Sequence, residues 1–311
     1  MLPEKKPSLS NHLKPGIIVP LMPFLTADQK YDFLAVEKQI DHYIRAGVAG
    51  IFVLTTCGQS PLFSFDENKD LAKVVKQGVG SRVLVYVGVG RTKDEPEYTL
   101  KMIEHAISLG TDAVVALCTD RTPEEQLTFF QELNRAQFPI IAYSLGNQQK
   151  QLQHLEEIVA LDSIVGLKVT IDIHDEQNKK YFRRAIATGK PVFMGEDIVL
   201  YDGLKLGAHG GVNAVANLIP ADVVELYNLY AQGRTEMAET RQTKINDLLL
   251  STLYYGKDTN GQSIDAASAL QNAMHQVFGY GGPTMKSPKP TYQNVEQEKI
   301  RETLVKYGFR F

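Results

Sequence analysis

The sequence predicts an α/β protein built as a (β/α)8 (TIM) barrel with a C-terminal helical extension. Short apolar, β-branched segments alternate eight times with segments that carry apolar residues at helical spacing. These units occupy about two hundred residues, which is a normal length for such a barrel. Beyond residue 220 only helical patterns follow. A doubly wound open sheet is the main alternative, but the strand count reaches eight without the signature of a second domain.

The strand segments consist mainly of Val, Ile, Leu and Ala, and several of them begin with glycine or proline. Most are too apolar along their whole length for a one-sided sheet, which is typical of parallel strands covered on both faces. We expect strands at Gly16–Pro20, Gly50–Leu54, Val83–Val89, Ala113–Ala116, Pro139–Tyr143, Ile164–Thr170, Pro191–Met194 and Gly211–Ala214.

The helix boundaries follow from capping residues. Gly47 ends the first helix, and Ser64 with Glu67 forms a capping box at the start of the second, which runs toward Gly78. We expect the other helices at Asp32–Ala46, Thr92–Leu109, Pro123–Ala136, Gln151–Leu161, Asp175–Thr188, Ile198–Leu206, Ala221–Ala231, Thr235–Tyr255, Ile264–Val277 and Val295–Tyr307. The domains we predict are a polar tail (1–14), the barrel (15–232) and the helical extension (233–311).

Composition excludes several classes of protein. Of 311 residues, 43% are hydrophobic and 22% charged, so a large core is expected. The formal net charge of −3 gives no electrostatic case for a nucleic-acid partner. Cys57 and Cys118 suggest no disulfide framework, and no Cys/His cluster has metal-ligand spacing, so we expect no metal and no cofactor. The first residues do not resemble a signal peptide, and no apolar run is long enough to cross a bilayer, which predicts a cytoplasmic protein without a membrane partner.

One strand contains a lysine, and this residue organises the functional hypothesis. The segment Ile164–Thr170 has Lys168 in its interior. If the strand is buried on both faces, the ammonium loses its hydration, and only pairing or deprotonation relieves that cost. A neutral amine attacks ketones and forms a Schiff base. Lys168 is therefore a candidate covalent nucleophile, although a lysine near a strand end can also simply reach solvent.

The residues at the strand ends predict the rest of the site, because catalytic groups of such barrels gather at the C-terminal edge. Tyr143 ends the strand before that of Lys168, and neighbouring strands lie only about 5 Å apart. A phenol there can relay protons as a carbinolamine becomes an imine. The second strand runs into Thr55, Thr56, Cys57 and Gly58, which suit a nest of backbone amides for a carboxylate or phosphate.

The last two strands contribute further candidates. The seventh ends in Gly195-Glu196-Asp197 and the eighth supplies Val212. Glu196 and Asp197 are read either as an acid/base pair or as a solvated loop with a helix N-cap.

In its strand and loop segments, the chain resembles the dihydrodipicolinate synthase / N-acetylneuraminate lyase superfamily. The matching segments, in order, are residues 19–24, 47–51 with Gly58-Gln59, 86–90, 139–143, 166–168, 195–197 and 211–217. The resemblance implies a (β/α)8 barrel, usually a homotetramer, and Schiff-base chemistry on pyruvate or another 2-oxo acid. It also implies Lys168 as the imine lysine, Tyr143 as the proton relay and Thr56 with Cys57 as the carboxylate-binding pair.

The sequence departs from the family pattern in places that concern the second substrate. If the family's Gly-Thr-Thr-Gly-Glu motif is aligned on Gly58, its second threonine corresponds to Cys57. If this chain instead has one inserted residue, Thr55 and Thr56 correspond to the threonine pair. The arginine that binds the second carboxylate in true dihydrodipicolinate synthases corresponds to Gln148, with Lys150 as the nearest cation. The tyrosine borrowed from a partner subunit is missing near residues 120–123, where Arg121 stands.

We therefore expect a class I, metal-independent lyase or aldolase that acts on a 2-oxo acid and an aldehyde and forms a homo-oligomer (a dimer or a tetramer). We do not expect a true dihydrodipicolinate synthase. The alternatives are a dehydratase of a sugar-derived 2-oxo acid, a non-catalytic ligand-binding relative, and a phosphate-binding barrel without covalent chemistry.

Overall fold

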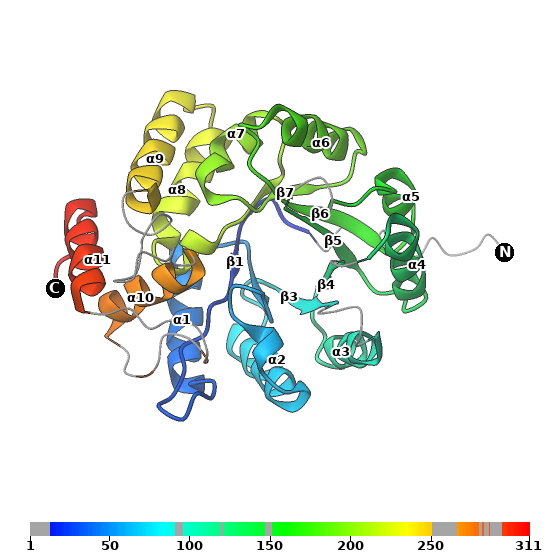
Figure 1. Cartoon of the computed structure of the whole chain (residues 1–311), viewed down its shortest axis with the longest axis horizontal. Helices are drawn as coiled ribbons and strands as arrows, with labels where there is room; N and C mark the ends of the chain where they lie inside the picture. Colours follow the sequence, from blue (N-terminus) through cyan, green and yellow to red (C-terminus); the bar gives the residue numbers. More distant parts are fainter. Residues whose placement is uncertain are drawn as a thin grey trace.

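The computed structural model describes residues 13–90, 96–118, 121–146, 151–250, 266–279 and 294–311, together with the single positions 282 and 286. The prediction of a (β/α)8 barrel is confirmed. Eight parallel strands pair in chain order and close through β8 and β1 (Figure 1). The strands are β1 Gly16–Pro20, β2 Gly50–Val53, β3 Leu84–Val89, β4 Ala113–Leu117, β5 Ile140–Leu145, β6 Ile164–Thr170, β7 Val192–Met194 and β8 Gly210–Val212.

Helices surround the barrel on its outside (Figure 1). The first eight are α1 Phe33–Ala46, α2 Phe65–Val79, α3 Pro96–Ser108, α4 Pro123–Asn134, α5 Leu155–Val159, α6 Glu176–Ala187, α7 Leu200–Lys205 and α8 Pro220–Ala231, with the short 3-10 helices η2 Ser60–Leu62, η3 Asp197–Val199 and η4 Ala214–Asn217 between them. The capping box of Ser64 and Glu67 is present as predicted.

Two predicted helices differ from the structure. The helix expected at Gln151–Leu161 is reduced to α5, because Gln151 and Gln153 make loop hydrogen bonds to Asn178 and Gln126 instead of joining a helix. The helix expected at Ile198–Leu206 is divided into η3 and α7. The predicted starts at Thr92 and Ile264 and the predicted end at Tyr255 lie outside the described residues.

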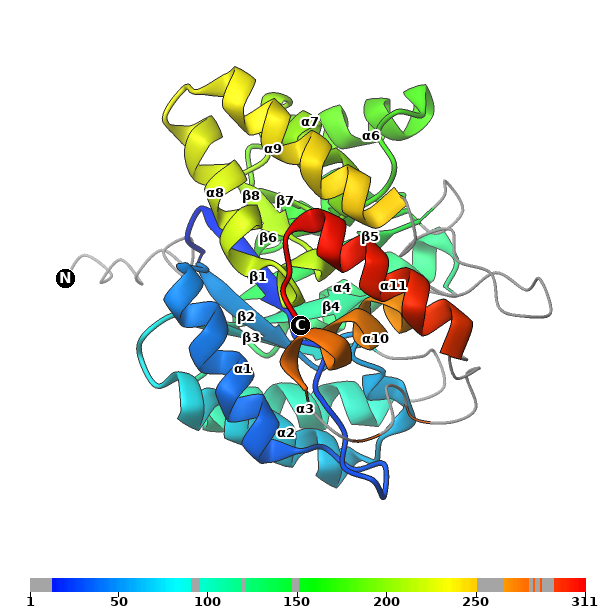
Figure 2. The same cartoon turned by 90° about the vertical axis from the view of Figure 1, so that its left-hand side faces the viewer.

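The C-terminal part is helical, as expected: α9 Thr235–Leu248, α10 Ala266–Phe278 and α11 Asn294–Tyr307. Helix α9 packs along α8, and Figure 2 shows α11 lying beside α9 and α10. Within the described part of the chain, no helix combines the length and the apolar character that a membrane span needs.

The strands separate two apolar clusters. The larger lies between the strands and the surrounding helices. The smaller consists of side chains on the other face of the strands, and it therefore fills the barrel interior: Leu13, Ile18, Phe52, Tyr86, Ala113, Val115, Leu117, Ile141, Tyr143, Val165, Phe193 and Val212. Of the charged side chains that the structure describes, only Lys168 and Asp197 are buried. Lys168 lies on β6, and Asp197 begins η3, which follows β7.

Asn217 ties the end of the barrel to its beginning. Its side chain is fully buried; Nδ2 donates to the carbonyls of Pro20 (2.8 Å) and Ala214 (2.9 Å). Its Oδ1 accepts from the Met22 amide (2.9 Å) and the Tyr43 hydroxyl (3.1 Å). One side chain therefore joins η4, the segment after β1, and α1, across the seam where the barrel closes.

Replacing this residue should destabilise the closed barrel. We expect Asn217→Ala to lower the free energy of unfolding by about 2–4 kcal/mol, because it leaves several buried backbone groups without partners. Urea denaturation followed by circular dichroism measures the change.

Asn213→Ala is the matched control. Asn213 is equally buried and lies just before η4, but among the described residues neither of its amide atoms has a hydrogen-bond partner. The Asn213→Ala substitution should lower the free energy of unfolding clearly less than Asn217→Ala does. Equal losses would show that lost packing, and not the hydrogen bonds, explains the effect.

Candidate active site

Lys168 and Tyr143 face each other inside the barrel. They are register partners on β5 and β6, and Lys168 Nζ lies 3.5 Å from the centre of the Tyr143 ring. Nζ also lies 5.9 Å from the centre of the Phe52 ring on β2. The side chains of Lys168 and Tyr143 are 6% and 5% exposed, so Lys168 is not a strand-end lysine reaching solvent. Within the described chain, no carboxylate lies within ion-pair distance of its amine.

Thr170 joins this pair, and the sequence reasoning missed it. Its hydroxyl donates to the Tyr143 hydroxyl over 3.2 Å. A Cβ on Gly195 would lie only 1.9 Å from Thr170 Oγ1, so glycine is required at 195 for this hydroxyl to keep its place. The alternation of side chains along β6 could have identified Thr170, because residues 168 and 170 lie on the same face of a strand.

The loop after β2 uses Thr55 for its own structure. The Thr55 hydroxyl donates to the Leu21 carbonyl (3.0 Å) and accepts from the Gly58 amide (2.9 Å). Leu54 and Gln59, on either side of the loop, have positive φ angles of 62° and 58°, which non-glycine residues adopt at a cost. The Thr55 hydroxyl is therefore engaged within the protein itself.

Thr56 and Cys57 present two unused backbone donors. Among the described residues, neither of their amides has an acceptor. The Thr56 side chain is exposed and borders a recess at the barrel mouth, which Leu117 and Tyr143 also line. Adjacent free amides in a tight turn form an anion-binding concavity, so this loop fits a carboxylate.

Cys57 is a neutral thiol in this setting. Its Sγ lies 3.2 Å from Thr55 Oγ1 and 3.7 Å from the Pro20 carbonyl oxygen. Burial raises the pKa of the Cys57 thiol, while the Thr55 hydrogen bond and the Lys168 charge lower it only in part. A neutral thiol is a weak hydrogen-bond donor and a poor nucleophile, so Cys57 is suited to line the site rather than to react.

The other predicted site residues lie on neighbouring strands. The Gly195 amide donates to the Val169 carbonyl (2.7 Å), which places residue 195 against the strand of Lys168. Val212 belongs to the interior cluster, and its register partner on β1 is Ile18. Arg121 stacks its guanidinium 4.4 Å from the centre of the Phe129 ring. Gln148 and Lys150 lie outside the described residues.

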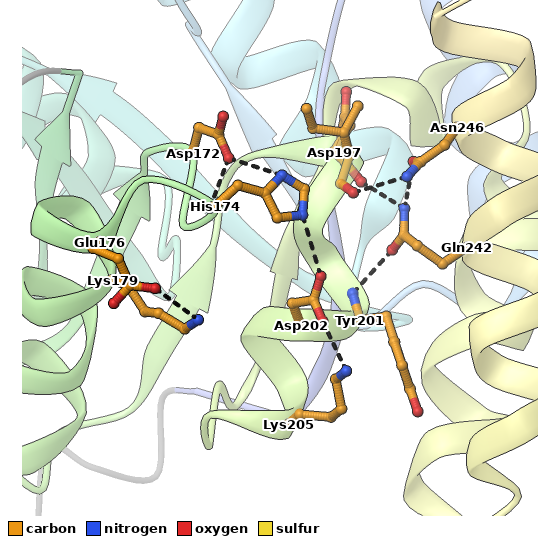
Figure 3. A network of polar contacts seen from close by, with 11 residues as sticks. Asp172, His174, Glu176, Lys179, Asp197, Tyr201, Asp202, Lys205, Gln242 and Asn246 are labelled. Carbon is orange, nitrogen blue, oxygen red and sulfur yellow. Dashed lines mark hydrogen bonds and ion pairs between the residues drawn. The ribbon is translucent and has the colours of Figure 1, made fainter.

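Glu196 and Asp197, which the sequence left as one acidic pair, have different environments. Asp197 is buried, and its carboxylate accepts from the Val215 amide at the start of η4 (3.2 Å). Figure 3 shows the Asp197 backbone held by Gln242 of α9. Glu196 is half-buried, and its pKa is raised from 4.5 to about 7. Burial is the largest cause, followed by the negative charges of Asp197 and Asp172, while the Asp197 backbone and Lys168 act in the opposite direction.

With this geometry in place, the similarity to known proteins is informative. The sequence pattern of the Dihydrodipicolinate synthetase family matches residues 14–306. The chain belongs to that family. Its members include aldolase-type lyases, and a relative described as an uncharacterized DapA-like lyase from Thermococcus onnurineus is 28% identical over 93% of this chain and 98% of its own.

Solved structures share the fold. CdNal from Clostridium difficile, in complex with mannosamine, has a TM-score of 0.81 at 19% identity and covers 94% of this chain and 99% of its own. YagE from E. coli K12, in complex with pyruvate, has a TM-score of 0.80 at 22% identity, with 95% and 99% covered.

The raised pKa of Glu196 predicts a pH-dependent stability. Between pH 4.5 and about 7 the unfolded chain ionises Glu196 while the folded protein keeps it protonated, so folding loses free energy as the pH rises through this range. Glu196→Gln removes the titration. Its stability relative to the unmodified protein should therefore rise with pH and level off above about 7, with a gain of at most about 3 kcal/mol.

Urea denaturation at about pH 4.5 and about pH 8 measures this difference. Glu176→Gln, which removes an exposed carboxylate at the start of α6, is the control and should show no such rise. If the gain of Glu196→Gln is the same at both pH values, Glu196 does not hold a proton in the folded protein.

Proposed function

We propose that this protein is a class I lyase or aldolase that forms a Schiff base between Lys168 and pyruvate or another 2-oxo acid. The amine attacks the C2 carbonyl to give a carbinolamine, which loses water to give the imine. The observation that carries the proposal is the buried Lys168 amine, 3.5 Å from the Tyr143 ring centre and without an ion-pair partner in the described chain.

Tyr143 and Thr170 support the proton transfers that this chemistry needs. The carbinolamine oxygen must gain a proton before it leaves as water, and C3 must lose one before the enamine forms. The Tyr143 hydroxyl is the titratable group nearest to Lys168 on the neighbouring strand, and Thr170 fixes its direction through a 3.2 Å hydrogen bond.

The loop at Thr56 and Cys57 supports recognition of the carboxylate. Its two free amides lie in the loop that follows β2, the strand whose Phe52 ring centre is 5.9 Å from Lys168 Nζ. A carboxylate held there orients the C2 carbonyl toward the amine, which lowers the entropic barrier to attack. The pyruvate in the YagE complex is consistent with a small 2-oxo acid as a ligand of this fold.

For the second step, we propose that the enamine attacks an aldehyde, or forms when a C–C bond breaks. A dihydrodipicolinate synthase activity is not proposed, because the position of the expected arginine is occupied by Gln148 in the sequence. The homo-oligomer that the resemblance implies stays a prediction.

Incubation with pyruvate and sodium borohydride tests the first step directly. We expect the intact protein to gain the mass of one reduced pyruvyl group, located at Lys168 by peptide mapping. Lys168→Ala should form no adduct and lose nearly all turnover, whereas Lys179→Ala, which removes a lysine of α6 paired with Glu176, should react like the unmodified protein. An adduct in Lys168→Ala would assign the chemistry to another lysine.

Tyr143→Phe tests the proton relay. We expect turnover to fall roughly a hundred- to ten-thousand-fold, the range that a general acid/base supplies, while 2-oxo acid binding weakens much less. Tyr181→Phe is the control, because Tyr181 hydrogen-bonds Ser144 on the opposite face of the same strand (2.9 Å). It should lower stability but spare turnover. Equal losses of turnover and binding in Tyr143→Phe would make Tyr143 a packing residue.

A further inference from the structure

A cavity of about 380 Å³ lies between α9 and α11, on the outside of the barrel. Figure 2 shows these two helices beside each other in the C-terminal part of the chain. The volume is within the range of small-molecule sites in proteins. None of the lining residues takes part in the imine chemistry proposed above. They are Lys244, Asp247 and Leu248 of α9 and Thr303, Lys306 and Tyr307 of α11.

Two lysines give this cavity positive charge that the described chain leaves unpaired. Among the described residues, neither Lys244 nor Lys306 has a carboxylate within ion-pair distance. Lys244 Nζ instead lies 4.5 Å from the centre of the Tyr307 ring, which keeps the ammonium beside the cavity. Asp247 is exposed, and no described side chain pairs with it either. The cavity therefore presents two cations to an anionic group and one carboxylate that accepts from hydroxyl groups.

Tyr307 adds a buried hydroxyl without a partner. Among the described residues, no group stands in hydrogen-bond geometry to its oxygen. Burial raises the pKa of Tyr307, with Asp222 adding to the rise and Arg241 opposing it, so the phenol keeps its proton and remains a donor. Arg241 is itself paired with Asp222 and Glu225, at 2.6 Å each. A buried donor left without a partner costs free energy, and a ligand oxygen in the cavity would relieve that cost.

Helix α9 also connects the cavity to the barrel. Gln242 Nε2 donates to the Asp197 carbonyl (3.0 Å), and its Oε1 accepts from the Tyr201 amide (2.9 Å), as Figure 3 shows. Asn246 Nδ2 donates to the Ile198 carbonyl (3.0 Å). One side of α9 is thus bonded to the loop after β7, while another side lines the cavity. A ligand that joins α9 to α11 would therefore stabilise the helical extension on the barrel.

We infer that this cavity is a binding site for a small hydroxylated organic anion, a carboxylate or a phosphate. Lys244 and Lys306 attract its charged group, and the Tyr307 hydroxyl donates to one of its oxygens. Asp247 accepts from its hydroxyl groups. The inference is independent of the imine chemistry, because no residue is common to the two sites.

Isothermal titration calorimetry of the full chain with gluconate and with glucose 6-phosphate tests the inference. The two probes combine hydroxyl groups with a carboxylate or a phosphate, and the tighter one identifies the preferred anionic group. We expect saturable binding of at least one probe at one site per chain, together with a melting temperature that rises with its concentration. Neutral glucose and inorganic phosphate, which each lack one half of the recognition, should bind roughly tenfold more weakly or less.

Substitutions in the cavity locate the ligand. Lys244→Ala and Lys306→Ala should each raise the Kd roughly tenfold, because each removes an ammonium that contacts the anion. Tyr307→Phe should raise the Kd roughly three- to tenfold but should not lower the free energy of unfolding, because the lost hydroxyl has no partner in the ligand-free protein. Lys299→Ala is the control: it removes an exposed lysine of α11 that does not line the cavity, and it should bind like the unmodified protein.

Lys168→Ala separates this site from the interior of the barrel. It should bind the anion as tightly as the unmodified protein does. Loss of binding in Lys168→Ala would place the ligand in the barrel and overturn the inference. It would equally be overturned if neither probe binds, if glucose binds as tightly as the anions, or if Lys244→Ala and Lys306→Ala leave the Kd unchanged.

Discussion

The arrangement at the barrel mouth depends on one constraint, the burial of the Lys168 amine against aromatic rings instead of a carboxylate. The barrel supplies these rings from β2 and β5, with Nζ 5.9 Å from the Phe52 ring centre and 3.5 Å from that of Tyr143. The faces of these rings attract the lysine head group. They do so without the ion pair that an aspartate would form. No carboxylate of the described chain therefore pairs with the amine.

The two sides of the mouth are held by different means. On the β2 side, the Thr55 hydroxyl donates to the Leu21 carbonyl and so ties the loop after β2 to the segment after β1, and the Lys286 amide donates to Gln59 Oε1 (2.8 Å). These contacts maintain the positive φ angles at Leu54 and Gln59. On the β7 side, the carboxylate of the buried Asp197 accepts from the Val215 amide of η4, and the neighbouring Glu196 is half-buried.

The sequence predicted most of the fold and the proximity of Lys168 to Tyr143, because both follow from local periodicity. Eight apolar segments alternating with helices leave few topologies, and Lys168 and Tyr143 adjoin because consecutive parallel strands pair. The rest depends on contacts between distant segments. The hydrogen bond from Thr55 to Leu21 joins two strand ends that are far apart in the sequence. The pKa of Glu196 is raised mainly by burial, to which the charges of Asp197 and of Asp172 from another loop add. The shortened α5 results from side-chain bonds to α4 and α6 that helical periodicity does not reveal.

A crystal structure of the protein soaked in pyruvate and reduced in the crystal tests the central claim most directly. The account predicts continuous electron density from Lys168 Nζ to C2 of the ligand, with the ligand carboxylate within hydrogen-bond distance of the Thr56 and Cys57 amides and the Tyr143 hydroxyl near the reacting carbon. Density for pyruvate that is separate from Lys168, or covalently attached to a different lysine, would contradict the assignment of the buried amine as the nucleophile.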